Sequence, residues 1–102
     1  MYDFLKEGLE CVKYCGNGEE HLSKIYIVDK NNSKAICWDR KPGLFKSNKA
    51  YINISDIVTI INAGVLKVAI KTEKRKVVFS FMSIENKEDI INVLNYLKSS
   101  LL

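Results

Sequence analysis

The sequence predicts a mainly β protein that ends in one α-helix, with its sheet bent or closed into an open barrel. Two observations lead to this fold class. Seven short segments rich in β-branched and aromatic residues follow one another within residues 9–81, separated by polar or glycine-containing turns. The last stretch, about residues 87–101, instead repeats its apolar residues with the period of a helix. One helix cannot cover a flat seven-stranded sheet, so we expect the sheet to curl and the helix to close one end.

The length and composition of the chain indicate a single small domain over residues 1–102, and we expect no cofactor. Hydrophobic residues make up 47% of the chain and charged residues 27%, the balance of a soluble globular protein. No apolar run approaches the ~18 residues of a membrane span, so we expect no transmembrane segment. The chain has three cysteines and one histidine and lacks a Cys-x-x-Cys motif. We therefore expect reduced thiols in a cytoplasmic protein and no metal site.

The expected strands alternate apolar and polar residues and are bounded by turns. They cover residues 9–14, 22–28, 34–39, 50–54, 57–62, 66–72 and 77–81. In the sixth, Leu66, Val68 and Ile70 alternate with polar or small residues, the pattern of a half-buried strand. A short helical turn is expected before the first strand, over residues 2–6.

The C-terminal segment carries the signals of a helix start followed by one apolar stripe. Asn86 is expected to cap the helix, and Asp89 stands three residues later, as in a weak capping box. The stripe that should pack on the sheet consists of Ile90, Val93, Leu94, Leu97 and Leu101.

This order of elements resembles the pleckstrin homology (PH) fold over nearly the whole chain. "GLECVKY" is similar to the opening strand of that family, "KIYIV" to the second strand, and "KAICWD", with Trp38, to the third. "INISDIVTIINAG" resembles the join between strands four and five, and "SIENKEDIINVLNYL" resembles the closing helix. The family usually has a buried tryptophan in that helix, where this chain has Val93. We expect Val93 to be buried in its place, with less apolar area.

In lipid-binding PH domains, the loops after the first, third and sixth strands meet at the open end of the barrel and hold phosphate groups. The resemblance assigns a set of basic residues to that end. This candidate head-group site comprises Lys13, His21, Lys24, Arg40, Lys41, Lys74 and Arg75. Lys13 matches a basic residue late in the first strand. Lys24 matches the arginine of the basic-x-Arg pair that begins the second strand, and His21 contributes charge only when protonated.

Two carboxylates and the choice of lysine over arginine weaken this site. Glu19 and Glu20 lie in the first of the three loops, although the three loops together still carry a net formal charge of +3. A bis-phosphorylated inositol favours forked arginine donors, which lysine does not supply. We therefore expect phosphoinositide binding to be weak or lost and attraction to acidic lipid to be modest. The alternative is that these lysines are only a solvated surface.

The main functional hypothesis is a non-catalytic interaction module at a membrane surface, with mainly protein–protein contacts. A PH-like fold with a degraded head-group site and many Lys, Ile and Asn residues resembles the inner membrane complex sub-compartment proteins of apicomplexan parasites. That family implies a peripheral membrane protein facing the cytoplasm, with an acylated anchor outside these residues. The acylated PH-domain proteins that recognise phosphatidic acid, and a PH module from a larger signalling enzyme, are rival resemblances.

Three other function classes were weighed. The first is a true sensor of anionic phospholipid, with phosphatidic acid or a phosphoinositide as ligand. The second is an enzyme using Cys15 and His21, which we do not expect because both are ordinary loop residues. The third is a nucleic-acid binder, which we do not expect because the chain has neither a basic helix nor an aromatic strand surface of the RRM type.

Overall fold

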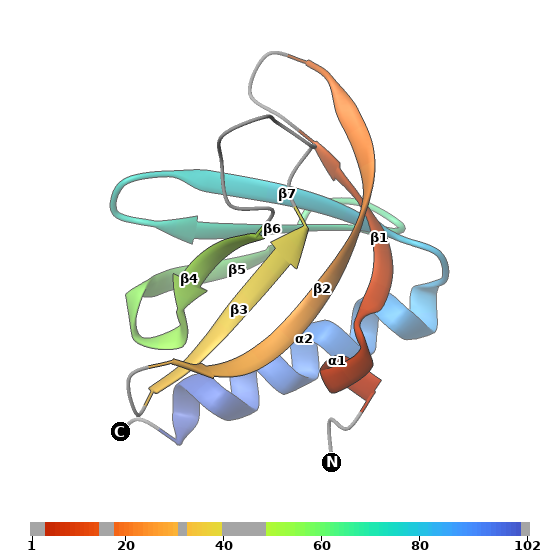
Figure 1. The fold of residues 1–102 in the computed structure, drawn as a ribbon. Coiled ribbons are helices and arrows are strands. Elements are labelled where there is room, and N and C mark those ends of the chain that lie inside the picture. The colour runs from red at the N-terminus through yellow and green to blue at the C-terminus, as the bar shows by residue number, and fades with distance from the viewer. Residues whose placement is uncertain (1–3, 15–17, 31–32, 40–48, 101–102) are drawn as a thin grey trace.

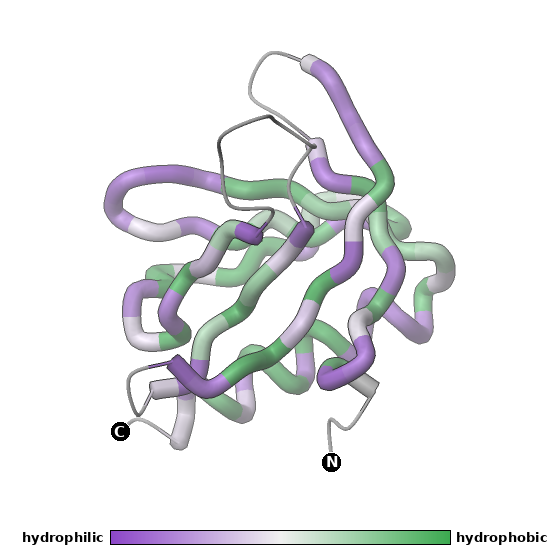
Figure 2. The backbone as a smooth tube through the Cα atoms, in the orientation of Figure 1, coloured by the Kyte–Doolittle hydropathy of each residue, from purple (hydrophilic) through white to green (hydrophobic). Residues whose placement is uncertain are grey.

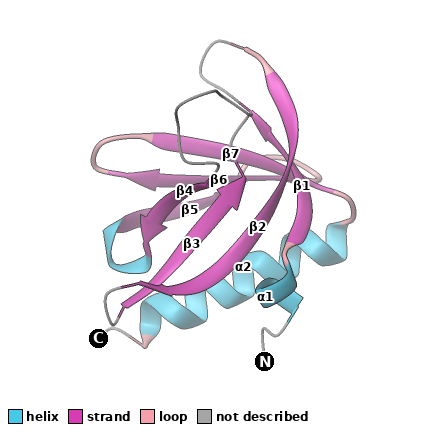
Figure 3. Ribbon diagram, in the orientation of Figure 1, coloured by secondary structure: helices cyan, strands magenta, loops and turns pink. Residues whose placement is uncertain are grey.

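The computed structural model describes residues 4–14, 18–30, 33–39 and 49–100, and it has the expected fold class. Seven antiparallel strands form one sheet, and a single long helix follows them (Figures 1 and 3). The elements are α1 (Phe4–Glu7), β1 (Leu9–Tyr14), β2 (Glu20–Lys30), β3 (Ser33–Asp39), β4 (Lys49–Asn53), the 3-10 turn η1 (Ile54–Asp56), β5 (Ile57–Asn62), β6 (Lys67–Thr72), β7 (Lys76–Phe81) and α2 (Ile84–Ser99).

The sheet has the strand order β4-β3-β2-β1-β7-β6-β5. Its first and last strands, β4 and β5, are neighbours in the chain and are joined by η1. The sheet must therefore bend round to bring its two outer strands together, and Figure 1 shows this curl with α2 lying across one end. The result is the bent sheet or open barrel, closed by a helix, that the sequence predicts.

The core lies inside this curl. Alternate residues of each strand point inward, as the period of a β-strand requires. On β2 these are Ile25 and Ile27, and on β7 they are Val77, Phe79 and Phe81. Figure 2 shows hydrophobic residues within the strands and along α2, and hydrophilic residues in the turn between β6 and β7. Trp38, the aromatic residue expected on the third strand, is part of this core.

Helix α2 starts earlier than predicted, and its cap is a different residue. Ser83 is the N-cap, and its hydroxyl accepts a hydrogen bond from the Asn86 backbone N–H at 3.1 Å. Asn86 is thus inside the first turn, and its assignment as the cap is wrong. Serine and asparagine are comparably good caps, so the choice between them is not evident from propensity.

The apolar stripe of α2 packs on the sheet as expected. Its buried apolar residues are Ile90, Val93, Leu94 and Leu97; Leu101 lies outside the described residues. Lys87 is also buried, and its ammonium donates to the Asn62 side-chain oxygen at 3.1 Å and to the Gly64 carbonyl at 3.3 Å. These bonds tie the first turn of the helix to the turn between β5 and β6.

The expected N-terminal turn is present as α1, shifted towards the first strand. It buries Leu5 completely. The chain then enters β1 through Gly8, whose φ is 98°, a conformation that favours glycine. A Cβ at Gly8 would also lie 2.6 Å from Cε1 of Tyr26, so a larger residue would displace the tyrosine ring.

Several strand boundaries differ by one or two residues from the predicted ones. β2 extends two residues further at each end than predicted. β4 ends at Asn53 instead of residue 54, because Ile54 turns inward as the first residue of η1. Within the described residues, no helix is long and apolar enough to cross a membrane.

Candidate functional site

Lys13 and His21, two of the predicted site residues, are brought together at the open end of the barrel. They are directly opposite each other on β1 and β2, and both are half-buried. The Lys13 ammonium donates to the Tyr14 carbonyl at 2.6 Å and lies 6.0 Å from the centre of the Phe79 ring. Because Phe79 belongs to the core, Lys13 lies over the inner face of the sheet. The structure thus places these two predicted residues side by side on the inner face.

The second strand does not present a pair of basic residues to this end. His21 and Ser23, two residues apart, share the inner face of β2, where a basic-x-Arg pair would be needed. The Ser23 hydroxyl is buried and donates to the Asp39 carbonyl at 2.8 Å. The His21 Nε2 lies 3.3 Å from the same carbonyl oxygen. These contacts join the start of β2 to the end of β3, and neither residue is a permanent cation.

Lys24 lies on the other face of the sheet. It falls between the buried residues Ser23 and Ile25, so its side chain points outward. Its partner across the strand pair is Glu10. The structure therefore separates Lys24 from Lys13 and His21, and Lys24 cannot complete a head-group site inside the barrel mouth.

Glu20 also falls on the outer face, because it is one residue from His21 along the same strand. It is exposed. Glu20 therefore shares the outer face of β2 with Lys24 and lies on the face opposite to Lys13. The main weakness of the predicted site is the missing basic partner on β2.

Arg75, at the turn between β6 and β7, has a structural role. Its guanidinium donates to the Tyr51 carbonyl on β4 at 3.1 Å and lies 5.3 Å from the centre of the Trp38 ring. Trp38 in turn contacts Phe79 edge to face, with ring centres 5.4 Å apart. Arg75 therefore connects this turn to β4 over the core. Lys74 beside it is exposed.

The predicted residues Arg40 and Lys41 lie outside the described residues. Lys49, which follows in the same connection, forms an ion pair with Asp39 at 2.5 Å and lies 4.1 Å from the centre of the Tyr26 ring. The hydrogen bond to Asp39 raises the pKa of Lys49. Asp39 thus neutralises the charge of Lys49, one of the positive charges in the connection between β3 and β4.

A groove that the sequence does not reveal lies where the two outer strands of the sheet approach each other. It has a volume of about 610 Å³ and is bounded by β4, η1, the start of β5 and the turn between β6 and β7. Its polar lining includes Lys30, Asn53, Asp56, Glu73 and Lys74. These residues are far apart in sequence, and only the closing of the sheet brings them together.

The buried thiols have no features of a nucleophile. Burial, reinforced by Asp39, raises the pKa of Cys11 to about 12. Burial also raises the pKa of Cys37. Both are free cysteines, and both remain protonated at neutral pH. Cys15, the other half of the conceivable Cys–His pair, lies outside the described residues. Among the residues described, no three potential ligands are grouped to hold a metal ion.

Comparison with known proteins gives a match in structure and none in sequence. No protein-family model and no curated protein matches the chain. The fold is similar to the solved structure of inner membrane complex (IMC) sub-compartment protein 3 (ISP3) from Toxoplasma gondii, with a TM-score of 0.70. The match covers 94% of this chain and 77% of that one, at 14% sequence identity. The chain thus shares the fold of ISP3, which supports its resemblance to the IMC sub-compartment proteins.

Proposed function

We propose that the chain is a non-catalytic interaction module that works at the surface of the inner membrane complex, mainly through contacts with other proteins. In this proposal it is a peripheral protein on the cytoplasmic side, and specific recognition of phosphoinositides has been lost. The alternative function is an anionic-phospholipid sensor that binds its ligand in the mouth of the barrel.

The arrangement of the predicted head-group cations carries this proposal. Of the five that lie within the described residues, Lys13 and His21 meet at the mouth of the barrel. Lys24 is on the outer face, and Arg75 is bound to the Tyr51 carbonyl. A bis-phosphorylated ligand needs several converging donors, preferably forked ones. The mouth formed by these residues does not supply them.

The groove between the outer strands supports protein contacts. β4 and β5 are the ends of the sheet, so within the described residues each has one edge without a neighbouring strand. An exposed edge can pair with an extended segment of another chain. The groove at these edges is lined by charged side chains of both signs, which suits a protein more than a lipid.

The setting at the inner membrane complex is supported by the fold of ISP3 and by the composition of the chain. The shared fold extends over 94% of the chain, so the likeness concerns the whole domain and not one motif. A fold can host several functions, and for that reason the assignment needs an experiment in cells.

The test is a chimera in Toxoplasma gondii in which this chain replaces the matching part of ISP3 and carries a fluorescent tag. The control joins the rest of ISP3 directly to the fluorescent protein. We expect the chimera to concentrate at the inner membrane complex and to recover more slowly after photobleaching than the control, because the domain adds contacts there. Equal recovery of the two, or diffuse fluorescence of the chimera, would contradict the proposal.

A further inference from the structure

One hairpin of the sheet carries a strong excess of positive charge. Residues 67–76, which form β6, the following turn and the start of β7, contain five basic residues and one acidic residue. Their net formal charge is +4, and residues 40–49, which lie almost wholly outside the described residues, carry an equal excess. A local charge excess on one hairpin is more specific than a mildly basic composition.

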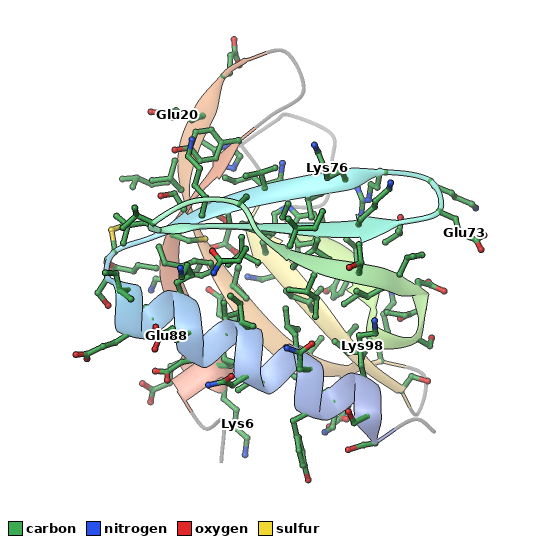
Figure 4. All side chains as sticks on the ribbon, turned by 180° about the vertical axis from the view of Figure 1, so that it is seen from behind. Lys6, Glu20, Glu73, Lys76, Glu88 and Lys98 are labelled. Atoms are coloured by element: carbon green, nitrogen blue, oxygen red, sulfur yellow. The ribbon has the colours of Figure 1, made fainter. Side chains whose placement is uncertain are left out.

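The lysines of this hairpin stand on the outer face of the sheet. The inward residues Val68 and Ile70 are buried, and Lys67 and Lys71 alternate with them and are exposed. Lys76 is exposed at the start of β7 and lies directly opposite Lys71. We call Lys67, Lys71 and Lys76 the basic hairpin face; Lys74, in the turn, lines the groove instead. Figure 4 shows Lys76 on the side of the molecule away from α2.

The arrangement of these lysines is not explained by stability. Like charges directly opposite each other across two strands are destabilising, yet Lys71 and Lys76 form such a pair. Within the described residues, neither forms an ion pair with a carboxylate. Lys67 lies 4.7 Å from the centre of the Tyr14 ring. The arginine of the turn points to Trp38, so the outward charges of the hairpin are lysine ammonium groups.

An exposed apolar side chain lies among these charges. Ile61 on β5 is 40% exposed and lies opposite Ala69, which is between Lys67 and Lys71 on β6. A nucleic acid would use the lysines but would gain nothing from exposed aliphatic groups, whereas the interface of a bilayer accommodates both. Lysine point charges also suit a fluid anionic surface, which demands no fixed geometry.

We propose that the basic hairpin face docks the protein on a membrane containing acidic phospholipids, with the lysines at the head groups. This inference rests on the proposed function, because it specifies how the module meets the membrane. The contact is electrostatic and lies outside the barrel mouth. Two carboxylates are nearby: Glu73 is in the turn, and Glu20 is on the outer face beyond Tyr14. They limit the affinity, so the contact acts together with protein contacts.

The test is co-sedimentation with phosphatidylcholine vesicles, with and without phosphatidylserine, at low and physiological salt. We expect binding only with phosphatidylserine, and binding that falls as salt rises. The double substitution Lys71→Gln and Lys76→Gln should weaken binding about 25-fold, because each lysine near an acidic surface contributes about five-fold. It should not lower the thermal unfolding midpoint, because it removes a repulsive pair.

The matched control is the double substitution Lys6→Gln and Lys98→Gln. It removes the same charge from the side of the molecule that carries the helices, away from Lys76 (Figure 4). This control should bind like the wild type. Equal weakening by both pairs, or no binding to phosphatidylserine even at low salt, would overturn the inference. Tighter binding to a single-stranded RNA oligonucleotide than to the vesicles, with the same lysine dependence, would overturn it too.

Two further arms separate this inference from its rivals. Vesicles containing a bis-phosphorylated phosphoinositide, at matched surface charge, should bind no more tightly, and Lys13→Gln should have little effect. Strong preference for those vesicles, abolished by Lys13→Gln, would place the lipid contact at the mouth of the barrel and overturn the inference. In the ISP3 chimera, loss of retention without any lysine substitution counts against the proposed function. Retention that is unchanged by Lys71→Gln and Lys76→Gln counts against docking through the basic hairpin face alone.

Discussion

Cys11 shows how a single buried group makes the stability of this protein depend on pH. It lies on the inner face of β1 and has no exposed surface. Burial raises its pKa from 9.0 to about 12, so the folded state strongly prefers the neutral thiol. The stabilising effect is complete below pH 9.0, where the thiol is protonated in both states. It decreases as pH rises from there towards about 12, because the unfolded chain then binds fewer protons.

We expect the advantage of the wild type over Cys11→Ala in unfolding free energy to shrink on raising pH. The decrease should be about 1 kcal/mol over the first pH unit above 9.0. Urea unfolding of both proteins at several pH values measures it. Cys37→Ala, in which Cys11 is retained, is the comparison for general alkaline effects. A constant difference between wild type and Cys11→Ala would show that the thiol titrates normally in the folded protein.

Position along the chain places candidate residues near one another but does not fix the side of a strand on which each lies. Lys13 and His21 are opposite each other on the inner face. Lys24 was assigned by its match to the basic-x-Arg pair, yet a shift of one residue moves a side chain to the opposite face. The role of Arg75 depends on Tyr51 and Trp38, which are distant in sequence. No local pattern could have revealed that contact.

Secondary-structure elements follow from the sequence because their apolar periods are clear. All seven strands and the closing helix are found near their predicted places. The start of α2 was predicted wrongly, because Ser83 and Asn86 are three residues apart and either can cap a helix. Ser83 is preferred in the structure, where its backbone is extended with φ −151° and its hydroxyl accepts from the Asn86 N–H.

Substitution Ser83→Ala should lower the free energy of unfolding by about 1 kcal/mol, because the first turn of α2 loses its side-chain cap. Asn86→Ala is the matched control. It should cost less than about 0.5 kcal/mol, since the structure gives the Asn86 side chain no capping role. Chemical denaturation of the two variants provides both values. The reverse order of destabilisation would mean that the helix starts where the sequence first suggested.

At the scale of the whole molecule, the curl of the sheet was predictable, but the way its ends are held was not. One helix and seven strands can bury their apolar faces only if the sheet bends, which follows from the number and type of the elements alone. The connection across the open side depends on Arg75, which reaches from the turn after β6 to the backbone of β4. The groove beside it arises from the same meeting of distant segments.

Loss of the Arg75 guanidinium should loosen β4 specifically. Arg75→Ala removes a hydrogen bond and a contact with Trp38, for a cost of about 1 kcal/mol. Hydrogen exchange of β4 amides should become faster, while the amides of β1 and β7 keep their protection. Lys74→Ala removes the neighbouring exposed charge and should leave β4 unchanged. Similar exchange in both variants would mean that Arg75 does not hold the edge of the sheet.

The uneven charge of the molecule also affects how it approaches a surface. The positive excess of residues 67–76 adds to the electric dipole moment of the protein a component that points towards that hairpin. A negatively charged surface exerts a torque on such a dipole once the two are within about a Debye length, roughly 8–10 Å. In the proposed docking, this torque turns the hairpin towards the membrane before the two surfaces touch.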